Sequence, residues 1–289
     1  MDEAKRRNLV VRVASGLVLF PLAVWLTWLG DWWFAALASA AAVVAAGELM
    51  AMFGPIGAGE VFGMAVAGAI PLATAREVLS SPSSTAGFGE LLPGWAGLGL
   101  AFATIALLVF FLFRRVALEQ VPSRMGAVVL SWLYCGLLVA SVVGLRLRRE
   151  GFSWVIIAFV VTWGNDTFAY FAGHFFGKHK LYERISPKKT WEGFAGGAVG
   201  SIGCALAARA ILRATTGELA DLGVLATLVT GAGGAALGPL GDLAESMVKR
   251  AAGVKDSGKI IPGHGGLLDR IDALLFVAPW VFVCAEYLR

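Results

Sequence analysis

The sequence predicts an all-α fold, a polytopic integral membrane bundle of about nine transmembrane helices. Three observations support this prediction. Hydrophobic residues make up 58% of the 289 residues, whereas a soluble domain contains about 45–50%. The mean hydropathy is +0.75. Apolar runs of about 20 residues, enough to cross roughly 30 Å of hydrocarbon, recur along the chain.

Each element of the predicted bundle is one such run. The first run follows Lys5, Arg6 and Arg7 and raises the alternative of a signal peptide. It is longer than a typical signal-peptide core and more membrane follows it, so we interpret it as a retained helix. The run at 61–79 is the weakest, and Ser80–Gly94 is expected to be an external connector. The predicted spans are 9–29, 32–52, 61–79, 93–113, 126–145, 153–176, 193–213, 221–241 and 271–288.

The distribution of Lys and Arg predicts the orientation, because cationic loops tend to stay on the cytoplasmic side. A cytoplasmic N-terminus places most of these residues inside, but Arg146-Leu147-Arg148-Arg149 then falls outside. Either a helix before this run is miscounted or the loop is a local exception. We expect two regions: N-terminal transmembrane helices in 1–150, and a C-terminal transmembrane catalytic region with cytoplasmic loops in 151–289.

The charged segment, Ser246–Asp272, is the most informative part of the chain. Only 15% of the chain is charged, so a dense mixture of Lys, Arg and Asp is not expected of an ordinary membrane loop. Its glycines around His264 would let backbone N–H groups approach an anion closely, as in a phosphate nest. Asp269 and Asp272, at the start of the last span, exceed what helix capping requires. The mixture suits a metal-bridged polyphosphate.

Carboxylates in and near this segment could bind a metal ion. Mg²⁺ prefers one or two carboxylates plus substrate phosphates, and Asp242, Asp269 and Asp166 could supply these oxygens. Four cations could balance the remaining phosphate charge: Lys249, Arg250, Lys255 and Arg270. The alternative is a simple i, i+4 salt-bridge ladder, such as Glu245 with Lys249. The sequence contains no Walker A loop, so the predicted triphosphate site is of another kind.

Polar residues also interrupt the predicted spans. Asn165, Asp166 and Thr167 stand together inside an apolar run and predict a wet cavity, with a helix–helix hydrogen-bond contact as the alternative. Glu48 lies near a helix end. It could snorkel to the interface or serve a function, and the sequence leaves both interpretations open.

A basic loop lies between 173 and 193. Its positive charge would attract it to anionic lipid headgroups irrespective of the function of the protein. Within it, Ser186-Pro187-Lys188-Lys189-Thr190 predicts a phosphate grip, because the proline would fix a turn and the cations and hydroxyls after it would converge. For His174 and His179 we expect surface or interfacial positions.

The charged segment resembles the signature of the phosphatidate cytidylyltransferases, also called CDP-diacylglycerol synthases, at Ser246, Lys249, Arg250, Lys255, Asp256, Gly258, Pro262, His264, Gly265, Gly266, Asp269, Arg270 and Asp272. Upstream, the central loop of that family is similar to this chain at Asn165, Asp166, Gly173, Gly177, Lys178, Ser186, Pro187, Lys188, Lys189, Thr190, Glu192 and Gly193. The first 150 residues are similar only in being membrane helices.

The resemblance implies that the chain transfers CMP from CTP to phosphatidate, giving CDP-diacylglycerol and pyrophosphate, with Mg²⁺ as cofactor. It implies metal ligation by Asp242 and Asp269, with Asp272 and Asp166 in support. The implied catalytic residues are Lys249, Arg250, Lys255, Asp256, His264 and Arg270. The implied substrate-binding residues are Asn165, Ser186, Lys188, Lys189, Thr190, Ser246, Gly265 and Gly266.

The resemblance also implies where the protein acts. The expected location is a bacterial-type inner (plasma) membrane, with a multi-pass chain whose active site faces the cytoplasm. The expected partners are CTP, phosphatidate and the lipid bilayer, with no nucleic acid, and a homodimer is an open alternative.

Three other functions would share some of these features. A transporter would also place Asp166 and Glu48 within the membrane, but would not require a dense charged loop. A CTP-using polyprenol kinase would share the nucleotide and metal site, although its alcohol acceptor would need a base. A lipid-binding scaffold would depend on the number of charges and not on their identity.

Overall fold

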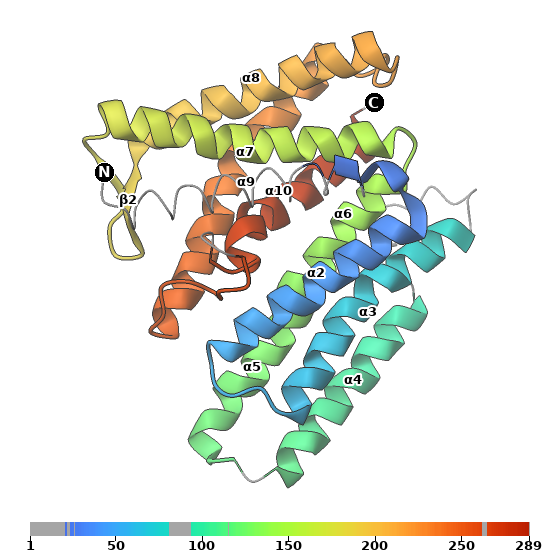
Figure 1. Cartoon of the computed structure of the whole chain (residues 1–289), viewed down its shortest axis with the longest axis vertical. Coiled ribbons are helices and arrows are strands. Elements are labelled where there is room, and N and C mark those ends of the chain that lie inside the picture. The colour runs from blue at the N-terminus through green and yellow to red at the C-terminus, as the bar shows by residue number, and fades with distance from the viewer. Residues whose placement is uncertain are drawn as a thin grey trace. The chain divides into compact units, whose positions relative to one another are not determined.

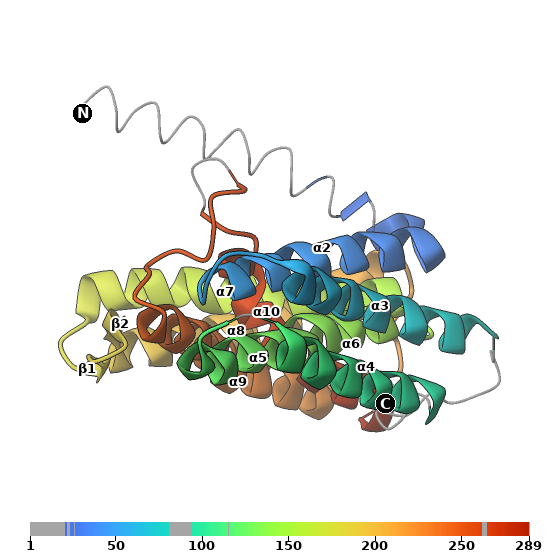
Figure 2. The ribbon, with the colours of Figure 1, turned by 90° about the horizontal axis from the view of Figure 1, so that it is seen from below.

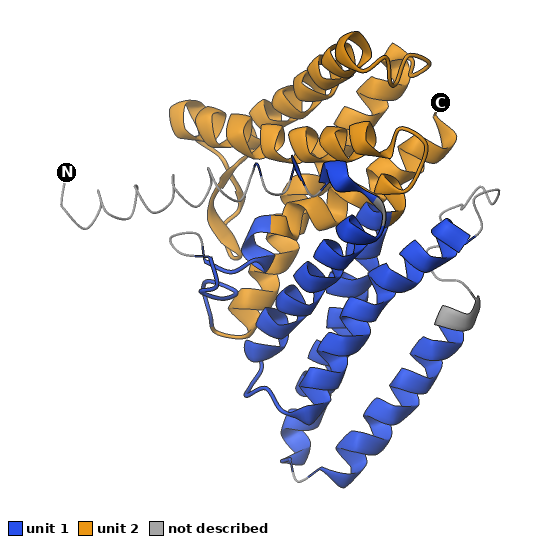
Figure 3. Cartoon of the chain, turned by 45° about the vertical axis from the view of Figure 1, so that its right-hand side comes forward, with its two compact units in different colours: residues 1–143, 254–270 blue, residues 144–253, 271–289 orange. Residues whose placement is uncertain are grey.

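The computed structural model describes residues 21, 24–25, 27–80, 94–114, 116–261 and 265–288. It is a helical protein with one short β-hairpin (Figure 1). The chain divides into two compact units (Figure 3): unit 1 contains 1–143 and 254–270, and unit 2 contains 144–253 and 271–289. The predicted functional division at residue 150 stays a prediction, because compactness alone does not assign function.

Unit 1 is built from the helices of the N-terminal half. These are α2 (Asp31–Ala51), α3 (Ala58–Ser80), α4 (Gly94–Phe113), the 3₁₀ turn η2 (Leu118–Gln120), α5 (Val121–Ser131) and the π-helical η3 (Trp132–Leu137). Their small residues permit close approach, as membrane helices require. Gly63 is one example: a Cβ there would lie 2.8 Å from Val128 Cγ1, and its carbonyl accepts a hydrogen bond from Trp132 Nε1 at 3.1 Å. Helix α6 (Leu138–Arg146) continues from η3 into unit 2.

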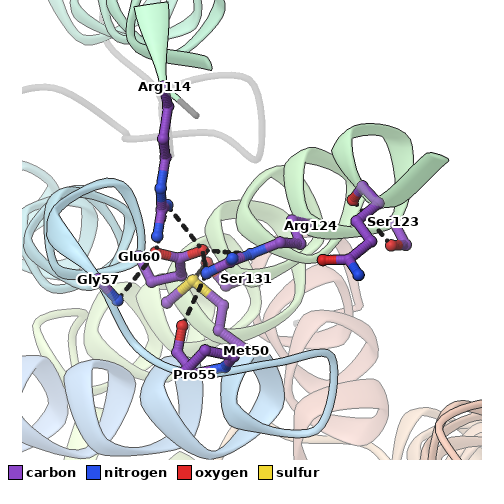
Figure 4. Close-up of polar contacts among 9 residues, drawn as sticks. Met50, Pro55, Gly57, Glu60, Arg114, Ser123, Arg124 and Ser131 are labelled. Atoms are coloured by element: carbon purple, nitrogen blue, oxygen red, sulfur yellow. Dashed lines mark hydrogen bonds and ion pairs between the residues drawn. The ribbon is translucent and has the colours of Figure 1, made fainter. Parts of the chain in front are cut away.

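A buried carboxylate holds three of these segments together (Figure 4). Glu60, in the first turn of α3, is 2% exposed. Its Oε2 accepts from Arg114 Nη1 at 2.9 Å, and its Oε1 accepts from Arg124 Nε at 2.9 Å. Arg124 also donates to the Pro55 carbonyl at 2.7 Å. The cluster therefore ties the loop before α3 to the residue after α4 and to α5.

Unit 2 contains α7 (Gly151–Phe176), strands β1 (Lys180–Tyr182) and β2 (Ser186–Thr190), α8 (Trp191–Thr215), α9 (Val224–Ala251) and most of α10 (Leu268–Tyr287). α7 and α8 run side by side, with the antiparallel hairpin of β1 and β2 at one end of the pair (Figures 1 and 2). Glycines allow this contact: a Cβ on Gly196 would lie 2.2 Å from that of Ala172. Side-chain volume at this position would separate α8 from α7.

The structure confirms a polytopic helical membrane protein. By length and composition, six helical segments of the described residues can cross a membrane: 32–51, 58–80, 118–146, 151–176, 191–215 and 224–251. A shorter apolar helix covers 97–113, and α10 adds a helix at the last predicted span. The predicted span 9–29 lies mostly outside the described residues, so the count of nine stays a prediction.

Helix α7 is continuous through Asn165 and Asp166, and α9 is continuous through Asp242 to Ala251. One local expectation, a turn fixed by Pro187, was wrong. Ser186–Thr190 forms a strand, because it pairs with β1, and the turn precedes it at 183–185.

The basic run at 146–149 lies at the end of unit 2 where α7 begins and α10 ends. Arg148 forms an ion pair with Glu286, near the C-terminus of α10, and its guanidinium lies 4.3 Å from the centre of the Phe282 ring. The basic loop at 178–189 follows the other end of α7, which is about 39 Å away at 1.5 Å per residue. The Arg148 charge is thus paired within the protein, which offers a physical reason for a local exception to the charge rule.

We predict that Arg149→Cys and Lys178→Cys, each in a background without native cysteines, face opposite sides of the membrane. Both positions are exposed, and α7 is long enough to cross the bilayer between them. A membrane-impermeant maleimide added to intact cells should label one position, and the other only after permeabilisation. Labelling of both from the same side would contradict the arrangement.

We also predict that Glu60→Gln lowers the free energy of unfolding by about 3–5 kcal/mol, because it leaves the buried Arg124 and the half-buried Arg114 without their carboxylate. Thermal unfolding in detergent would measure the loss. The control is Glu119→Gln, the same substitution at an exposed position, which should change stability by less than about 0.5 kcal/mol. Equal effects of the two substitutions would contradict the role of Glu60.

Candidate functional site

Unit 2 contains a cavity of about 600 Å³ at the end of α7 that adjoins the hairpin. Its wall combines polar side chains of α7, cations of the hairpin and the middle of α9. It brings together seven residues that the sequence predicted for the site: Asn165, Asp166, Ser186, Lys188, Lys189, Thr190 and Asp242. A cavity is therefore present at Asn165 and Asp166, where the sequence predicted one, and the helix that carries them is unbroken.

Pro239 links α9 to α7 within this wall. A proline inside a helix has no N–H to donate to the carbonyl four residues earlier, here that of Ala235. Asn165 Nδ2 donates to this Ala235 carbonyl at 3.3 Å. Asn165 is 1% exposed, and its Oδ1 is buried without a hydrogen-bond partner. An amide oxygen of this kind, in a wall that also contains Asp166, suits a water or cation ligand.

Lys189 connects the hairpin to α9. Its Nζ lies 2.8 Å from Asp242 Oδ2 and donates to the Pro239 carbonyl at 3.1 Å. Asp242 Oδ1 accepts from Ser246 Oγ, one turn later in α9, at 3.2 Å. The Asp242 side chain keeps 38% of its surface exposed. It is thus held in place and still open to a ligand.

Three carboxylates of unit 2 interact electrostatically. Asp272, buried at the start of α10, is repelled by Asp242 and Asp166 and attracted by Lys249. Neighbouring carboxylates of this kind favour a divalent cation. No three His, Cys, Asp or Glu side chains among the described residues are arranged as a complete metal-ligand set. Asp166 and Asp242, which line the same cavity, could hold Mg²⁺ as one or two carboxylate ligands, with substrate phosphates completing the coordination.

The hairpin is fixed independently of any substrate. Thr190 is the N-cap of α8, and its hydroxyl accepts from Gly193 N at 3.1 Å. Glu192 accepts from the backbone N–H of Lys178 at 3.1 Å, and it pairs with His179 Nδ1 at 2.6 Å. His179 is exposed, as expected from the sequence. These contacts hold the strand that carries Lys188 and Lys189, and Lys188 is itself exposed.

At the end of α9, the salt bridge between Glu245 and Lys249, which the sequence offered as the alternative interpretation, is present. Both side chains are buried, whereas Arg250 is exposed. The helix places Asp242, Glu245, Ser246 and Lys249 on one face. The roles of Lys249 and Arg250 toward a substrate stay predictions.

The remaining predicted residues belong to unit 1. Lys255, Asp256 and Arg270 are exposed. Asp269 Oδ2 accepts from Ser257 N at 3.0 Å and from Gly266 N at 2.9 Å. Gly265 has a φ of +85°, which favours glycine. His264 lies outside the described residues. The roles predicted for these residues are not tested by their positions.

Sequence reasoning missed Pro239, gave Glu192 no role beyond the resemblance, and left Glu48 undecided. Pro239 could have been noticed because it stands inside an apolar run, where a proline leaves the carbonyl four residues earlier without its helical hydrogen bond. Glu192 follows Thr190 in the first turn of a helix, where acidic residues are common. The contacts of Glu48 involve residues more than 200 positions away, so no local pattern reveals them.

We predict that Gly197→Ala destabilises the cavity wall by about 1–3 kcal/mol through overpacking. Its Cβ would lie 2.9 Å from Asn165 Oδ1 and 3.1 Å from the Asn165 carbonyl oxygen. The control is Gly203→Ala in the same helix, where a Cβ meets nothing within 4 Å, so the better helix former should leave stability equal or higher. Thermal unfolding in detergent separates the two, and equal stability of both variants would contradict the packing.

The chain is similar to several bacterial proteins named phosphatidate cytidylyltransferase. It is 41% identical to that of Bacillus subtilis (strain 168) over 185 residues, which cover 63% of this chain and 65% of the relative. It is 32% identical to that of Brucella abortus biovar 1 (strain 9-941) over 289 residues, which cover 96% of this chain and 93% of the relative. It is 46% identical to that of Staphylococcus saprophyticus over 132 residues, 46% of this chain and 48% of the relative.

A family model also matches almost the whole chain. The match runs from residue 10 to residue 288, so it includes the N-terminal helices as well as the cavity and the charged segment, and the model is described as the cytidylyltransferase family. Together with the Brucella relative, which aligns over nearly its full length, this match shows that the chain belongs to the cytidylyltransferase family.

Proposed function

We propose that this chain is a CTP:phosphatidate cytidylyltransferase, which transfers CMP from CTP to phosphatidate and releases pyrophosphate. The observation that carries the proposal is the cavity of unit 2. In a membrane protein, it places Lys188 and Lys189 beside Asp166 and Asp242. Cations and carboxylates side by side suit two phosphate-bearing substrates and a divalent cation. The names of the relatives support the same substrates.

The reaction explains why no catalytic base is needed. The nucleophile is a phosphate oxygen of phosphatidate, which is largely dianionic at neutral pH because the second pKa of a phosphate monoester is about 6. This oxygen attacks the α-phosphorus of CTP. A new P–O bond forms, the bond from the α-phosphorus to the bridging oxygen breaks, and pyrophosphate leaves with that electron pair. The task of the protein is to hold two anions in line against their repulsion.

Among the described residues, the cations are suited to binding phosphate groups and the carboxylates to binding the metal ion. Lys188 is exposed on the hairpin and can receive the lipid phosphate. Lys189 reaches from the hairpin to Asp242 and holds the wall of the cavity together. Asp242, with Asp272 and Asp166 in support, would hold Mg²⁺, which supplies Lewis-acid stabilisation of the CTP phosphates. Arg250, exposed at the end of α9, can offset charge on the departing pyrophosphate.

The site requires access to both lipid and nucleotide. Tyr170, which lines the cavity, is 67% exposed, and the next residue of α7, Phe171, is 52% exposed, as expected for side chains that face lipid. The basic hairpin belongs on the cytoplasmic side by the charge rule, where CTP is available. We therefore place the protein in a bacterial inner membrane with the cavity open to the cytoplasm. A homodimer stays a prediction.

We predict that Asp242→Asn lowers CDP-diacylglycerol formation by at least about 100-fold, because it removes a group that stabilises transition-state charge through the metal. The assay uses purified protein in detergent with CTP, phosphatidate and Mg²⁺, and measures both CDP-diacylglycerol and pyrophosphate. Omission of Mg²⁺ should abolish the wild-type reaction.

The matched control is Asp221→Asn, the same substitution at an exposed position in the loop before α9, which should keep wild-type activity. A folded wild-type protein that forms no product would contradict the proposed function. Wild-type activity of Asp242→Asn would contradict the metal role of this carboxylate.

A further inference from the structure

Glu48 of α2 is a buried carboxylate that, among the described residues, accepts its hydrogen bonds from the charged segment. It is 8% exposed. Its Oε1 accepts from the backbone N–H of Leu267 at 3.0 Å. Its Oε2 accepts from the backbone N–H of Leu268 at 2.9 Å and from Ser257 Oγ at 3.2 Å. Glu48 and its partners all belong to unit 1.

Two of these donors lie at the start of α10, which begins at Leu268. The first N–H groups of a helix have no partner within the helix, and a negative charge beside them is favoured by the helix dipole. Glu48 thus acts as a cap supplied from another helix, 219 residues earlier in the chain than Leu267. Because both carboxylate oxygens are used, the position of Glu48 fixes where α10 begins within unit 1.

The glycines of the charged segment fit this carboxylate. A Cβ on Gly258 would lie 2.3 Å from Glu48 Oε1, and a Cβ on Gly266 would lie 2.6 Å from Glu48 Oε2 and 1.9 Å from Ser257 Oγ. Both glycines are therefore required by the close approach of Glu48 and Ser257. The sequence predicted a different role for Gly266, as part of a phosphate nest. In the structure, the N–H of Gly266 already donates to Asp269 Oδ2, so this N–H is used within the protein.

Ser257 joins the carboxylate of Glu48 to that of Asp269. Its hydroxyl donates to Glu48 and accepts from Asp269 N at 3.3 Å, while its own N–H donates to Asp269 Oδ2 at 3.0 Å. Ser257 is buried, whereas the adjacent Asp256 and Lys255 are exposed. The network therefore anchors the backbone of the segment and leaves its charged side chains available.

We propose that Glu48 is a positioning residue for cytidylyl transfer: it fixes the backbone of the segment 254–261 and 265–270 in an arrangement that leaves Lys255, Asp256 and Arg270 exposed and available to the nucleotide. This inference rests on the proposed function. The N-terminal half then contributes to the reaction without touching a substrate. Of the two interpretations that the sequence left open for Glu48, this inference favours a function over snorkelling to the interface.

The test variant is Glu48→Gln, which keeps the shape of the side chain. Each carboxylate oxygen accepts from a backbone N–H, so either orientation of the new amide places an NH₂ group against an N–H donor. We expect kcat/KM for CTP to fall by about 10–100-fold, the scale seen when a group that orients functional residues is lost. Glu48→Asp, which keeps the charge on a shorter side chain, should recover part of this loss.

The control for general destabilisation is Leu107→Ala, in the buried face of α4 in unit 1. It should lower Tm and leave the kcat/KM of the folded protein unchanged. Hydrogen exchange at Leu267 and Leu268 should accelerate in Glu48→Gln and not in Leu107→Ala. A kcat/KM for Glu48→Gln no lower than that of Leu107→Ala, or unchanged exchange at these two amides, would overturn the inference.

If Glu48→Gln does not fold, Gly258→Ala replaces it, since its Cβ would displace the same carboxylate. A lowered kcat/KM is then expected, and a wild-type value overturns the inference. An inactive but folded wild-type protein would instead contradict the proposed function, and the exchange measurement would still test the position of the segment.

Discussion

The structure depends on one constraint: a charged or polar group buried among membrane helices needs a partner within the protein, because lipid offers none. In unit 1, Glu60 meets Arg114 and Arg124, while Glu48 meets the first N–H groups of α10. Each of these contacts joins segments that are far apart in the chain. The polar groups therefore determine which helix ends and loops come together, and apolar packing fills the space between them.

The same constraint builds the cavity of unit 2. Pro239 leaves the Ala235 carbonyl without its helical partner, and Asn165 supplies the missing donor from α7. Lys189 then binds the Pro239 carbonyl and Asp242. Pro239 thus organises the amide of Asn165 on α7, the ammonium group of Lys189 on β2 and, through Lys189, the carboxylate of Asp242 on α9. The glycines of α8 allow α7 to come close enough for this arrangement.

The sequence predicted the parts of the fold that depend on local composition. Eight of the predicted spans correspond to helices, because hydrophobic length is a property of each segment alone. The residues gathered at the cavity were also predictable, since Asp166, Lys189 and Asp242 are charges in or beside apolar runs. The hairpin was not, because its strands depend on pairing across a turn and on the Glu192 contacts. The role of Glu48 was undecided for a similar reason: its partners lie at the other end of the chain.

The central claim is that the lipid receives the α-phosphate of CTP through its own phosphate oxygen. The most direct measurement compares CTP labelled with ³²P at the α position and at the γ position, each incubated with purified protein, phosphatidate and Mg²⁺. Cytidylyl transfer predicts that only the α label enters the chloroform-soluble lipid and that the γ label leaves in pyrophosphate. Entry of the γ label into lipid would show a kinase instead, and would contradict this account.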